Sequence, residues 1–245
     1  MTTTTTELIG QALSEDLAGA AMSLARSFDT GATLWVVSPQ WEPHAHHVAV
    51  EFVHPVIMGK RALPAVALVG ADPVAQARVA VRPGDVVVAV ASADDRVVLD
   101  LMRRAPAWGV KTLWIGFGDR PVEGAADHVL WVDSDDPMMP ATGRFVLMYH
   151  LLWELTHVCF EHSGLLRADT PECTDDVCVT CSDEGRLAEV VEAPMDLFEP
   201  ALVRTATGEE EVDVTLVGEV RPGDLVIVHA GSALTRLDAS AGGLP

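Results

Sequence analysis

The run Asp85-Val86-Val87-Val88-Ala89-Val90-Ala91 is apolar at every position after its first residue. A strand with one face in water alternates apolar and polar residues, whereas a parallel strand that helices cover on both faces is apolar throughout. Short apolar runs that follow turn residues are typical of buried strands, and Pro83-Gly84 stands directly before this one. We therefore predict a buried strand of a parallel sheet over 85–91.

Similar apolar runs lie on both sides of this strand along the chain. The segments between them are about long enough for the crossover connections that parallel strands require. We expect strands at Leu34–Val37, Ala65–Val69, Thr112–Phe117 and Val129–Val132, with crossover helices within 43–56, 73–80 and 95–107. An amphipathic helix over 7–28 opens the pattern, and a long helix over about 140–162 closes it. The sequence thus predicts a doubly wound α/β domain over 1–165, with a five-stranded parallel sheet.

The pattern changes after this domain. Residues 166–177 carry a proline and several acidic residues without apolar periodicity, which indicates a linker. From Cys178 onward, short β-like runs alternate with turn residues and no helical stretch of useful length intervenes; the runs are 187–191, 201–205, 211–216 and 224–230. This predicts a small β-barrel over 178–245.

One pentapeptide occurs twice. Val-Arg-Pro-Gly-Asp stands at 81–85 and again at 220–224, each time before an apolar run. Pro-Gly-Asp is favourable turn chemistry ahead of a strand, and the patterns around the two copies differ. We interpret the two copies as the same kind of turn and not as an internal duplication.

Charge and composition exclude several classes of function. The 245 residues include 36 Asp and Glu but only 16 Lys and Arg, which gives a formal charge of -20. Such a field repels nucleic-acid phosphates and anionic lipid surfaces, so we expect neither as a partner. No apolar stretch approaches the roughly 20 residues that a bilayer span needs, and the start of the chain lacks the pattern of a signal peptide. We expect a cytoplasmic protein.

Three of the four cysteines, Cys173, Cys178 and Cys181, lie close together in the sequence. In a reducing compartment such clustering favours metal or thiolate chemistry over a disulfide framework. The pair Cys178 and Cys181 fits either a redox pair or half of a structural zinc site. Cys173 could be a third zinc ligand, and His229, Cys159 or another chain would have to complete the site. The alternative for His229 is a hydrogen-bonded core histidine on a strand.

Two segments near the end of the chain carry a family resemblance: Val-Asp-Val-Thr-Leu-Val-Gly at 212–218, and Val-Arg-Pro-Gly-Asp-Leu-Val-Ile-Val-His-Ala-Gly-Ser-Ala at 220–233. They resemble the HupF/HypC family of nickel–iron hydrogenase maturation chaperones, over residues 178–237. The resemblance implies an OB-like barrel in which a cysteine and a histidine help to hold an iron fragment that bears cyanide and carbon monoxide. The histidine position matches His229.

The position of the cysteine differs from the family pattern. The family's cysteine stands at the very N-terminus, whereas Cys178, our first counterpart, and Cys181, our second, are internal. The partners that the resemblance implies are HypD-like scaffold proteins and the hydrogenase large-subunit precursor.

A second resemblance covers about residues 10–162. The stretch Ala45-His-His-Val-Ala-Val-Glu51 matches the pattern Ala-x-His-x-Ala-x-Glu of the SIS family, in its sedoheptulose-7-phosphate isomerase branch. The resemblance implies that His47, Glu51 and His150 serve a metal site and acid/base proton transfer, and that the domain forms a homodimer or homotetramer. His47 and Glu51 stand four apart on one helical face, so they can share a zinc or other divalent ion. The alternative is a polar cluster at a dimer interface.

Two loops depart from the SIS pattern where that family binds phosphate. Ser38-Pro-Gln-Trp-Glu-Pro43 replaces one glycine-rich loop and is poor in free backbone donors. Ala91-Ser-Ala-Asp-Asp-Arg96 replaces the other; it keeps Ser92 as a candidate substrate contact but adds two carboxylates. A like-charge pair at 4 Å costs about 4 kcal/mol at an effective dielectric constant of 20. Thr142 also stands where the family has a glutamine. Phosphosugar isomerisation is therefore disfavoured.

Together these observations predict a hydrogenase maturation factor made of a degenerate SIS domain and a HupF/HypC-like barrel. Cys178 or Cys181, with His229, would carry or insert the iron fragment, and the α/β domain would provide oligomerisation or a second metal site. One alternative is a metal-dependent isomerase or lyase that uses Glu51 and His150 in acid/base roles. Another is an adaptor whose barrel is stabilised by zinc.

Overall fold

The chain forms two compact units in a computed structural model that describes residues 11–166, 185–196 and 199–237. The first unit comprises Met1–Arg103 and Lys111–Ala168, and the second comprises Arg104–Val110 and Asp169–Pro245. Among the described residues, no helix has both the length and the apolar character that crossing a bilayer would require.

The first unit is an α/β domain with a parallel sheet, as the sequence predicts. Its elements are α2 (Gln11–Asp29), β1 (Leu34–Val37), α3 (Glu42–Val53), β2 (Ala65–Leu68), α4 (Pro73–Ala80), β3 (Val86–Val90), α5 (Arg96–Arg104), β4 (Lys111–Phe117), β5 (His128–Val132) and α6 (Gly143–Glu161). The strand order is β2-β1-β3-β4-β5, and the paired strands all run parallel. The sheet changes direction of winding at β1 and β3, as in doubly wound folds.

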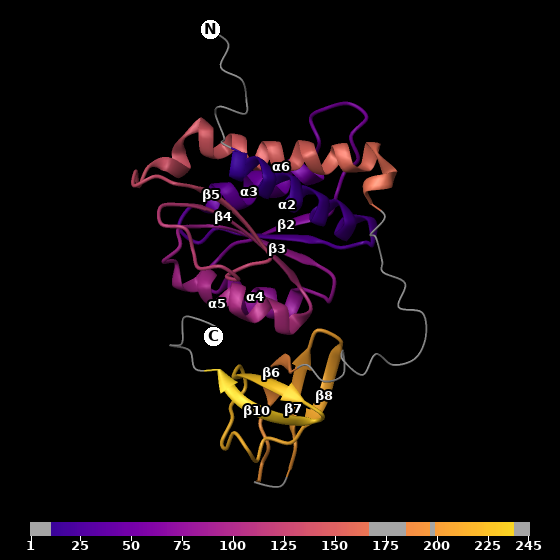
Figure 1. The fold of residues 1–245 in the computed structure, drawn as a ribbon, viewed down its shortest axis with the longest axis vertical. Coiled ribbons are helices and arrows are strands. Elements are labelled where there is room, and N and C mark those ends of the chain that lie inside the picture. Colours follow the sequence, from indigo (N-terminus) through magenta and orange to yellow (C-terminus); the bar gives the residue numbers. More distant parts are fainter. Residues whose placement is uncertain (1–10, 167–184, 197–198, 238–245) are drawn as a thin grey trace. The chain divides into compact units, whose positions relative to one another are not determined.

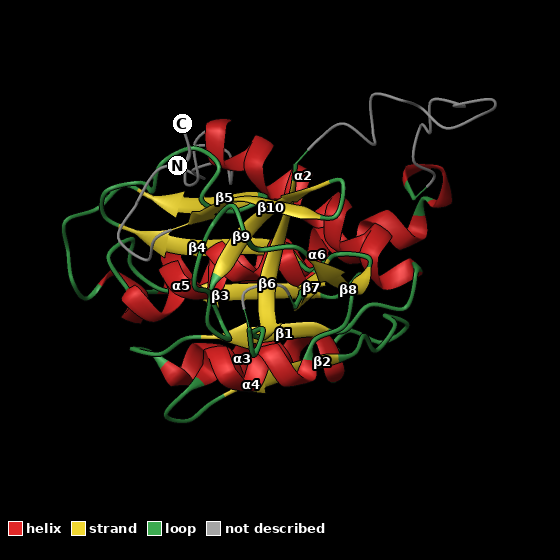
Figure 2. Ribbon diagram, turned by 90° about the horizontal axis from the view of Figure 1, so that it is seen from below, coloured by secondary structure: helices red, strands yellow, loops and turns green. Residues whose placement is uncertain are grey.

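Helices cover both faces of this sheet (Figure 1). One layer holds α2, α3 and α6, and the other holds α4 and α5. Every residue of β3 is buried, which is why its sequence is apolar throughout. The strands and helices of this unit are also seen from below in Figure 2, where helices are red and strands are yellow.

The repeated pentapeptide forms the same turn in both units. Gly84 and Gly223 each have φ 92°, a conformation that glycine adopts without steric cost. Asp85 and Asp224 each accept the backbone N–H of the arginine three residues earlier at 2.9 Å. The two copies therefore share a turn conformation, and each stands directly before a strand of a different sheet.

The second unit contains a five-stranded antiparallel sheet with the order β10-β9-β6-β7-β8. Its strands are β6 (Arg186–Glu192), β7 (Ala201–Thr205), β8 (Gly208–Val212), β9 (Leu225–His229) and β10 (Ser232–Leu237). The expected run over 211–216 is wrong in its bounds, because Ala206 and Thr207 form a two-residue turn and β8 starts directly after it, at Gly208. A single bridge joins Asp213 to Ser232, and the barrel closure that the sequence suggested stays a prediction.

A buried carboxylate lies inside the second unit. Glu189 of β6 is 2% exposed and accepts a hydrogen bond from the Trp108 indole at 2.6 Å and from Arg104 at 2.7 Å. Trp108 belongs to the short 3-10 helix η1 (Ala105–Trp108). A carboxylate at this depth needs such partners, because an unpaired buried charge costs several kcal/mol, about 3–5 in typical cases.

Candidate metal centre

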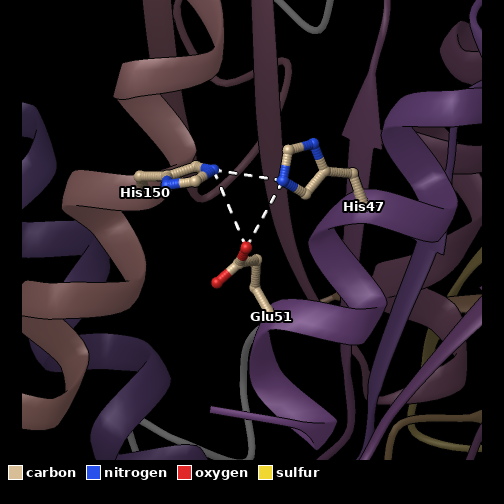
Figure 3. A group of neighbouring side chains, drawn as sticks. All are labelled: His47, Glu51 and His150. Atoms are coloured by element: carbon tan, nitrogen blue, oxygen red, sulfur yellow. Dashed lines mark hydrogen bonds and ion pairs between the residues drawn. The ribbon is translucent and has the colours of Figure 1, made fainter. Parts of the chain in front are cut away.

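Three predicted ligands lie together in the first unit (Figure 3). His47 and Glu51 project from successive turns of α3, and His150 projects toward them from α6. The two Nε2 atoms of His47 and His150 are 3.2 Å apart. Glu51 Oε1 lies 3.4 Å from the Nε2 atom of His47 and 3.9 Å from that of His150. The sequence-based grouping of these three residues agrees with the geometry.

The three atoms fit a single divalent ion. Zinc binds imidazole nitrogen and carboxylate oxygen at about 2.0–2.2 Å, so neighbouring ligand atoms of a tetrahedral site are about 3.3–3.6 Å apart. Two of the three distances, 3.2 and 3.4 Å, lie close to that range, and the third is 3.9 Å. Two histidines and one carboxylate, with a fourth position left open, form the donor set of many catalytic zinc sites.

Exposure leaves that fourth position reachable from solvent. The side chains of His47 and His150 are 38% and 41% exposed, whereas that of Glu51 is 15% exposed. The apolar face of α3, which includes Val48 and Phe52, is buried in the core of the unit. The polar residues therefore remain at the margin between α3 and α6, where they face one another.

A tyrosine that the sequence reasoning missed completes the centre. The Tyr149 hydroxyl lies 2.9 Å from His47 Nδ1 and 3.3 Å from His44 Nδ1. Burial, and secondarily the charge of Glu51, raise the pKa of Tyr149 to about 12, so the phenol is neutral at physiological pH. Burial also lowers the pKa of His44. Tyr149 is the only tyrosine of the chain. Its position directly before His150 is the one feature of the sequence that could have indicated it.

Other residues of the two histidine-bearing helices lie apart from this cluster. The two ring nitrogens of His157 each lie 2.9 Å from a backbone oxygen, that of Trp153 or that of Arg61. Glu154 contacts Lys60 at 3.5 Å. These residues tie α6 to the segment that follows α3.

The loops that differ from the SIS phosphate loops use their polar groups internally. Ser92, a candidate substrate contact, donates its hydroxyl proton to Asp94 at 2.6 Å. Asp95 accepts the backbone N–H of Val97 at 2.9 Å at the start of α5, and the buried Ser38 donates to the backbone of Val90 at 2.8 Å. This geometry offers no support for a phosphate contact at Ser92.

His229 is the last residue of β9 and pairs with Ser232 of β10 across a tight hairpin. The two residues of the turn, Ala230 and Gly231, have φ 48° and 79°, as a type I′ turn requires. Cys173, Cys178 and Cys181 lie outside the described residues. The expected pairing of His229 with one of these cysteines therefore stays a prediction.

In comparisons with known proteins, the two units match different proteins. The HupF/HypC family matches residues 185–242, a stretch that contains His229 and begins after the cysteine pair. No curated protein matches the chain at a significant level. A phosphoheptose isomerase from Francisella tularensis matches the first unit with a TM-score of 0.52 and 19% identity, over 60% of this chain and 88% of that one. Phosphoheptose isomerase GmhA from Neisseria gonorrhoeae has a TM-score of 0.48 and 19% identity, over 61% and 86%.

The family match agrees with the first resemblance, and the fold of the Francisella isomerase agrees with the second. The chain carries a HupF/HypC family domain at residues 185–242, and the unit before it has the SIS fold of the Francisella isomerase. At this level of identity the second likeness concerns the fold alone.

Proposed function

We propose that this protein is a maturation chaperone for nickel–iron hydrogenase. The observation that carries the proposal is the HupF/HypC match over residues 185–242, with His229 at the end of β9. Maturation proteins of the hydrogenase are the corresponding partners, and we propose a HypD-like scaffold protein and the large-subunit precursor among them.

The cargo in this proposal is an iron fragment that bears cyanide and carbon monoxide. Low-spin iron with such ligands is soft, and a thiolate is a better donor to it than any oxygen ligand. Cys178 or Cys181 would supply the thiolate, and the His229 imidazole would bind the same fragment or move a proton beside it. The iron fragment must also leave the protein, so it has to be bound only transiently. A single Cys/His pair is sufficient for such binding.

The test is anaerobic purification after co-expression with the scaffold protein, followed by infrared spectroscopy and metal analysis. We expect cyanide and carbonyl stretching bands in the wild-type protein and their loss in His229→Ala and in one of the variants Cys178→Ser and Cys181→Ser. Cys159→Ala is the matched control, since Cys159 is a buried cysteine of α6 and should keep the bands. Stoichiometric zinc with a silent spectrum would contradict carriage and favour the zinc-stabilised adaptor.

A second function is favoured by the cluster of His47, Glu51 and His150. We propose that these residues hold a divalent ion such as zinc. A bound ion would act as a Lewis acid on a small substrate at the open fourth position, which suits an isomerase or lyase reaction. The carboxylates at Asp94 and Asp95 argue against a phosphorylated substrate.

The chain contains its own control for this second proposal. Glu42 and His46 form a pair on α3 with the same spacing and a 3.5 Å distance, but both side chains are 59% exposed. We expect Glu51→Gln to weaken Co²⁺ binding at least tenfold, as measured by titration of the visible cobalt bands, and Glu42→Gln to leave it unchanged. Equal loss in both variants would mean that exposed surface pairs bind the ion, and the centre would be refuted.

A further inference from the structure

We propose that Tyr149 and His44 are positioning residues, which hold His47 in the tautomer whose Nε2 lone pair faces Glu51 and His150. The inference rests on the proposed metal centre and adds to it two residues that touch no ion. A histidine ligand binds a metal through an unprotonated nitrogen, so its other nitrogen must carry the proton. The donors and acceptors around Tyr149 determine which nitrogen that is.

The chain of hydrogen bonds begins at Pro140. Burial lowers the pKa of His44, and a hydrogen bond with the Pro140 backbone acts in the opposite direction; because proline has no N–H, its carbonyl accepts in this bond and the His44 ring donates. Because Nδ1 of His44 faces Tyr149, we assign this bond to Nε2. His44 is 8% exposed, a depth that favours the neutral ring, and a neutral imidazole carries one N–H. Its Nδ1 is therefore an acceptor.

The next two hydrogen bonds then have fixed directions. The Tyr149 hydroxyl has one proton, which it must donate to His44 Nδ1 at 3.3 Å. The phenol oxygen can then only accept at its other contact, so His47 Nδ1 is the donor across 2.9 Å. With its proton on Nδ1, His47 presents a lone pair at Nε2, the atom that lies 3.4 Å from Glu51 and 3.2 Å from His150.

The hydrogen-bonded series His44, Tyr149 and His47 is called the relay below. Packing holds its side chains in place. Tyr149 is 1% exposed, and its ring meets the His47 ring edge-on with centroids 5.2 Å apart. The His44 ring lies 5.4 Å from the Phe145 ring and 5.8 Å from the Tyr149 ring. The folded core therefore fixes these side chains before any ion arrives, which lowers the entropic cost of binding.

The first test removes one oxygen atom. Tyr149→Phe keeps the buried ring but leaves His47 Nδ1 without the acceptor. We expect the affinity for Zn²⁺ and Co²⁺, measured by competition with a chromogenic chelator, to fall 10- to 100-fold, the usual effect of removing an outer partner of a metal-bound histidine. Far-ultraviolet circular dichroism and the melting temperature of the metal-free protein show whether the variant is folded.

Two substitutions at His44 separate positioning from packing. Asn in place of His44 keeps an acceptor near the position of Nδ1, so His44→Asn should retain affinity to within several-fold. His44→Leu removes the acceptor and should lose as much affinity as Tyr149→Phe. Because the relay acts as one unit, the double variant should lose little more than either single variant.

A signal from Tyr149 itself gives a readout that does not depend on activity. Since the chain has a single tyrosine, labelling with ¹³Cζ-tyrosine yields one nuclear magnetic resonance line. We expect this line to move when Zn²⁺ is added to the wild-type protein and to stay in place in Glu51→Gln.

The outcomes distinguish this inference from the proposal beneath it. Wild-type affinity in Tyr149→Phe and His44→Leu, or a tyrosine line that ignores bound zinc, would overturn the relay while the metal centre stands. A wild-type protein that binds neither ion would overturn the centre and the relay together.

Discussion

The Asp85 carboxylate accepts hydrogen bonds both from the turn before β3 and from residues at the start of β1. It accepts the backbone N–H of Arg82 at 2.9 Å and that of Thr33 at 2.8 Å, and it accepts the Trp35 indole N–H at 2.9 Å. Its counterpart Asp224 accepts the N–H of Arg221 at 2.9 Å and has an exposed contact with Arg236 at 3.7 Å. The aspartate of the pentapeptide therefore contributes more to the stability of the first unit than to that of the second.

This difference gives a prediction with a built-in control. Asp85→Ala removes the acceptor of three part-buried hydrogen bonds, and a donor left unsatisfied costs about 1–3 kcal/mol when it is buried, so we expect the first unit to lose about 3 kcal/mol of stability. Asp224→Ala should leave that unit unchanged. Urea unfolding followed by the helical signal of circular dichroism measures the first unit, because the described α-helices lie there. Equal midpoints for the two variants would contradict the prediction.

Two histidines make stability depend on pH. Burial is the main cause that lowers the pKa of both His44 and His128 in the folded protein. A folded pKa below the unfolded value of about 6.5 means that the unfolded chain takes up protons first as the pH falls. The stabilisation by the neutral rings is complete above about pH 6.5 and is lost progressively below it.

The measurement is the urea midpoint of the first unit between pH 8 and pH 5. We expect the midpoint to fall below about pH 6.5 in the wild-type protein, and His128→Gln to make the fall shallower. His46→Gln is the control, since the His46 side chain is 59% exposed. A slope unchanged in His128→Gln would refute the assignment of this residue.

At the residue scale, the sequence was sufficient to group the three residues of the proposed metal centre, but it did not predict the residues that hydrogen-bond to them. His47 and Glu51 are four apart, so helical geometry alone places them together, and the family resemblance added His150. Tyr149 and His44 are joined only because α3 and α6 pack side by side, and no local pattern carries that contact. The pairing of His229 with Cys178 or Cys181 stays a prediction.

At the element scale, β4 depends on a residue without a side chain. A Cβ atom at Gly116 would collide with the backbone oxygen of Ala91 and with the Trp131 ring. That ring packs edge-on against Trp114 with centroids 6.0 Å apart, and the Trp114 indole donates to the same Ala91 oxygen at 3.2 Å. Backbone and rigid aromatic groups surround the site, so it cannot relax easily.

The element-scale prediction contrasts two glycines. Gly116→Ala should destabilise the first unit by about 2–4 kcal/mol through overpacking. Gly19 lies within α2, where an added Cβ meets open space, so Gly19→Ala should stabilise the unit by about 0.5–1 kcal/mol. Thermal unfolding of both variants beside the wild-type protein measures the two shifts. A neutral Gly116→Ala would mean that Trp131 can move aside.

The same scale explains which elements the sequence predicted. The apolar runs β1, β3 and β4 were found nearly to the residue, because strands buried on both faces have no polar positions to obscure them. In the second unit, β8 reads Gly-Glu-Glu-Glu-Val and lies at the edge of its sheet, where charged residues discourage further strand pairing. An edge strand built of acidic residues lacks the apolar pattern on which the prediction depended. The other edge strand, β10, reads Ser-Ala-Leu-Thr-Arg-Leu; polar residues interrupt its apolar ones, and the sequence analysis did not predict it.

At the scale of the whole molecule, the dominant property is charge. The 36 acidic and 16 basic residues give the chain a formal charge of -20, and a compact state brings these charges closer than an unfolded one. Some acids are paired, as in Lys60 with Glu161 at 2.8 Å and Arg120 with Asp16 at 2.9 Å. Such exposed pairs contribute about 0–1 kcal/mol each, and far fewer cations than anions are available to form them.

Salt should therefore stabilise this protein. Raising NaCl from about 10 to 200 mM shortens the screening length from roughly 30 Å to below 10 Å, which weakens the repulsion among distant acidic groups more than the attraction within close pairs. We expect the melting temperature to rise by several degrees. Tetramethylammonium chloride should give the same rise if screening is the cause, whereas a rise confined to Na⁺ would indicate a specific cation site. A melting temperature that falls with salt would mean that the ion pairs outweigh the net repulsion.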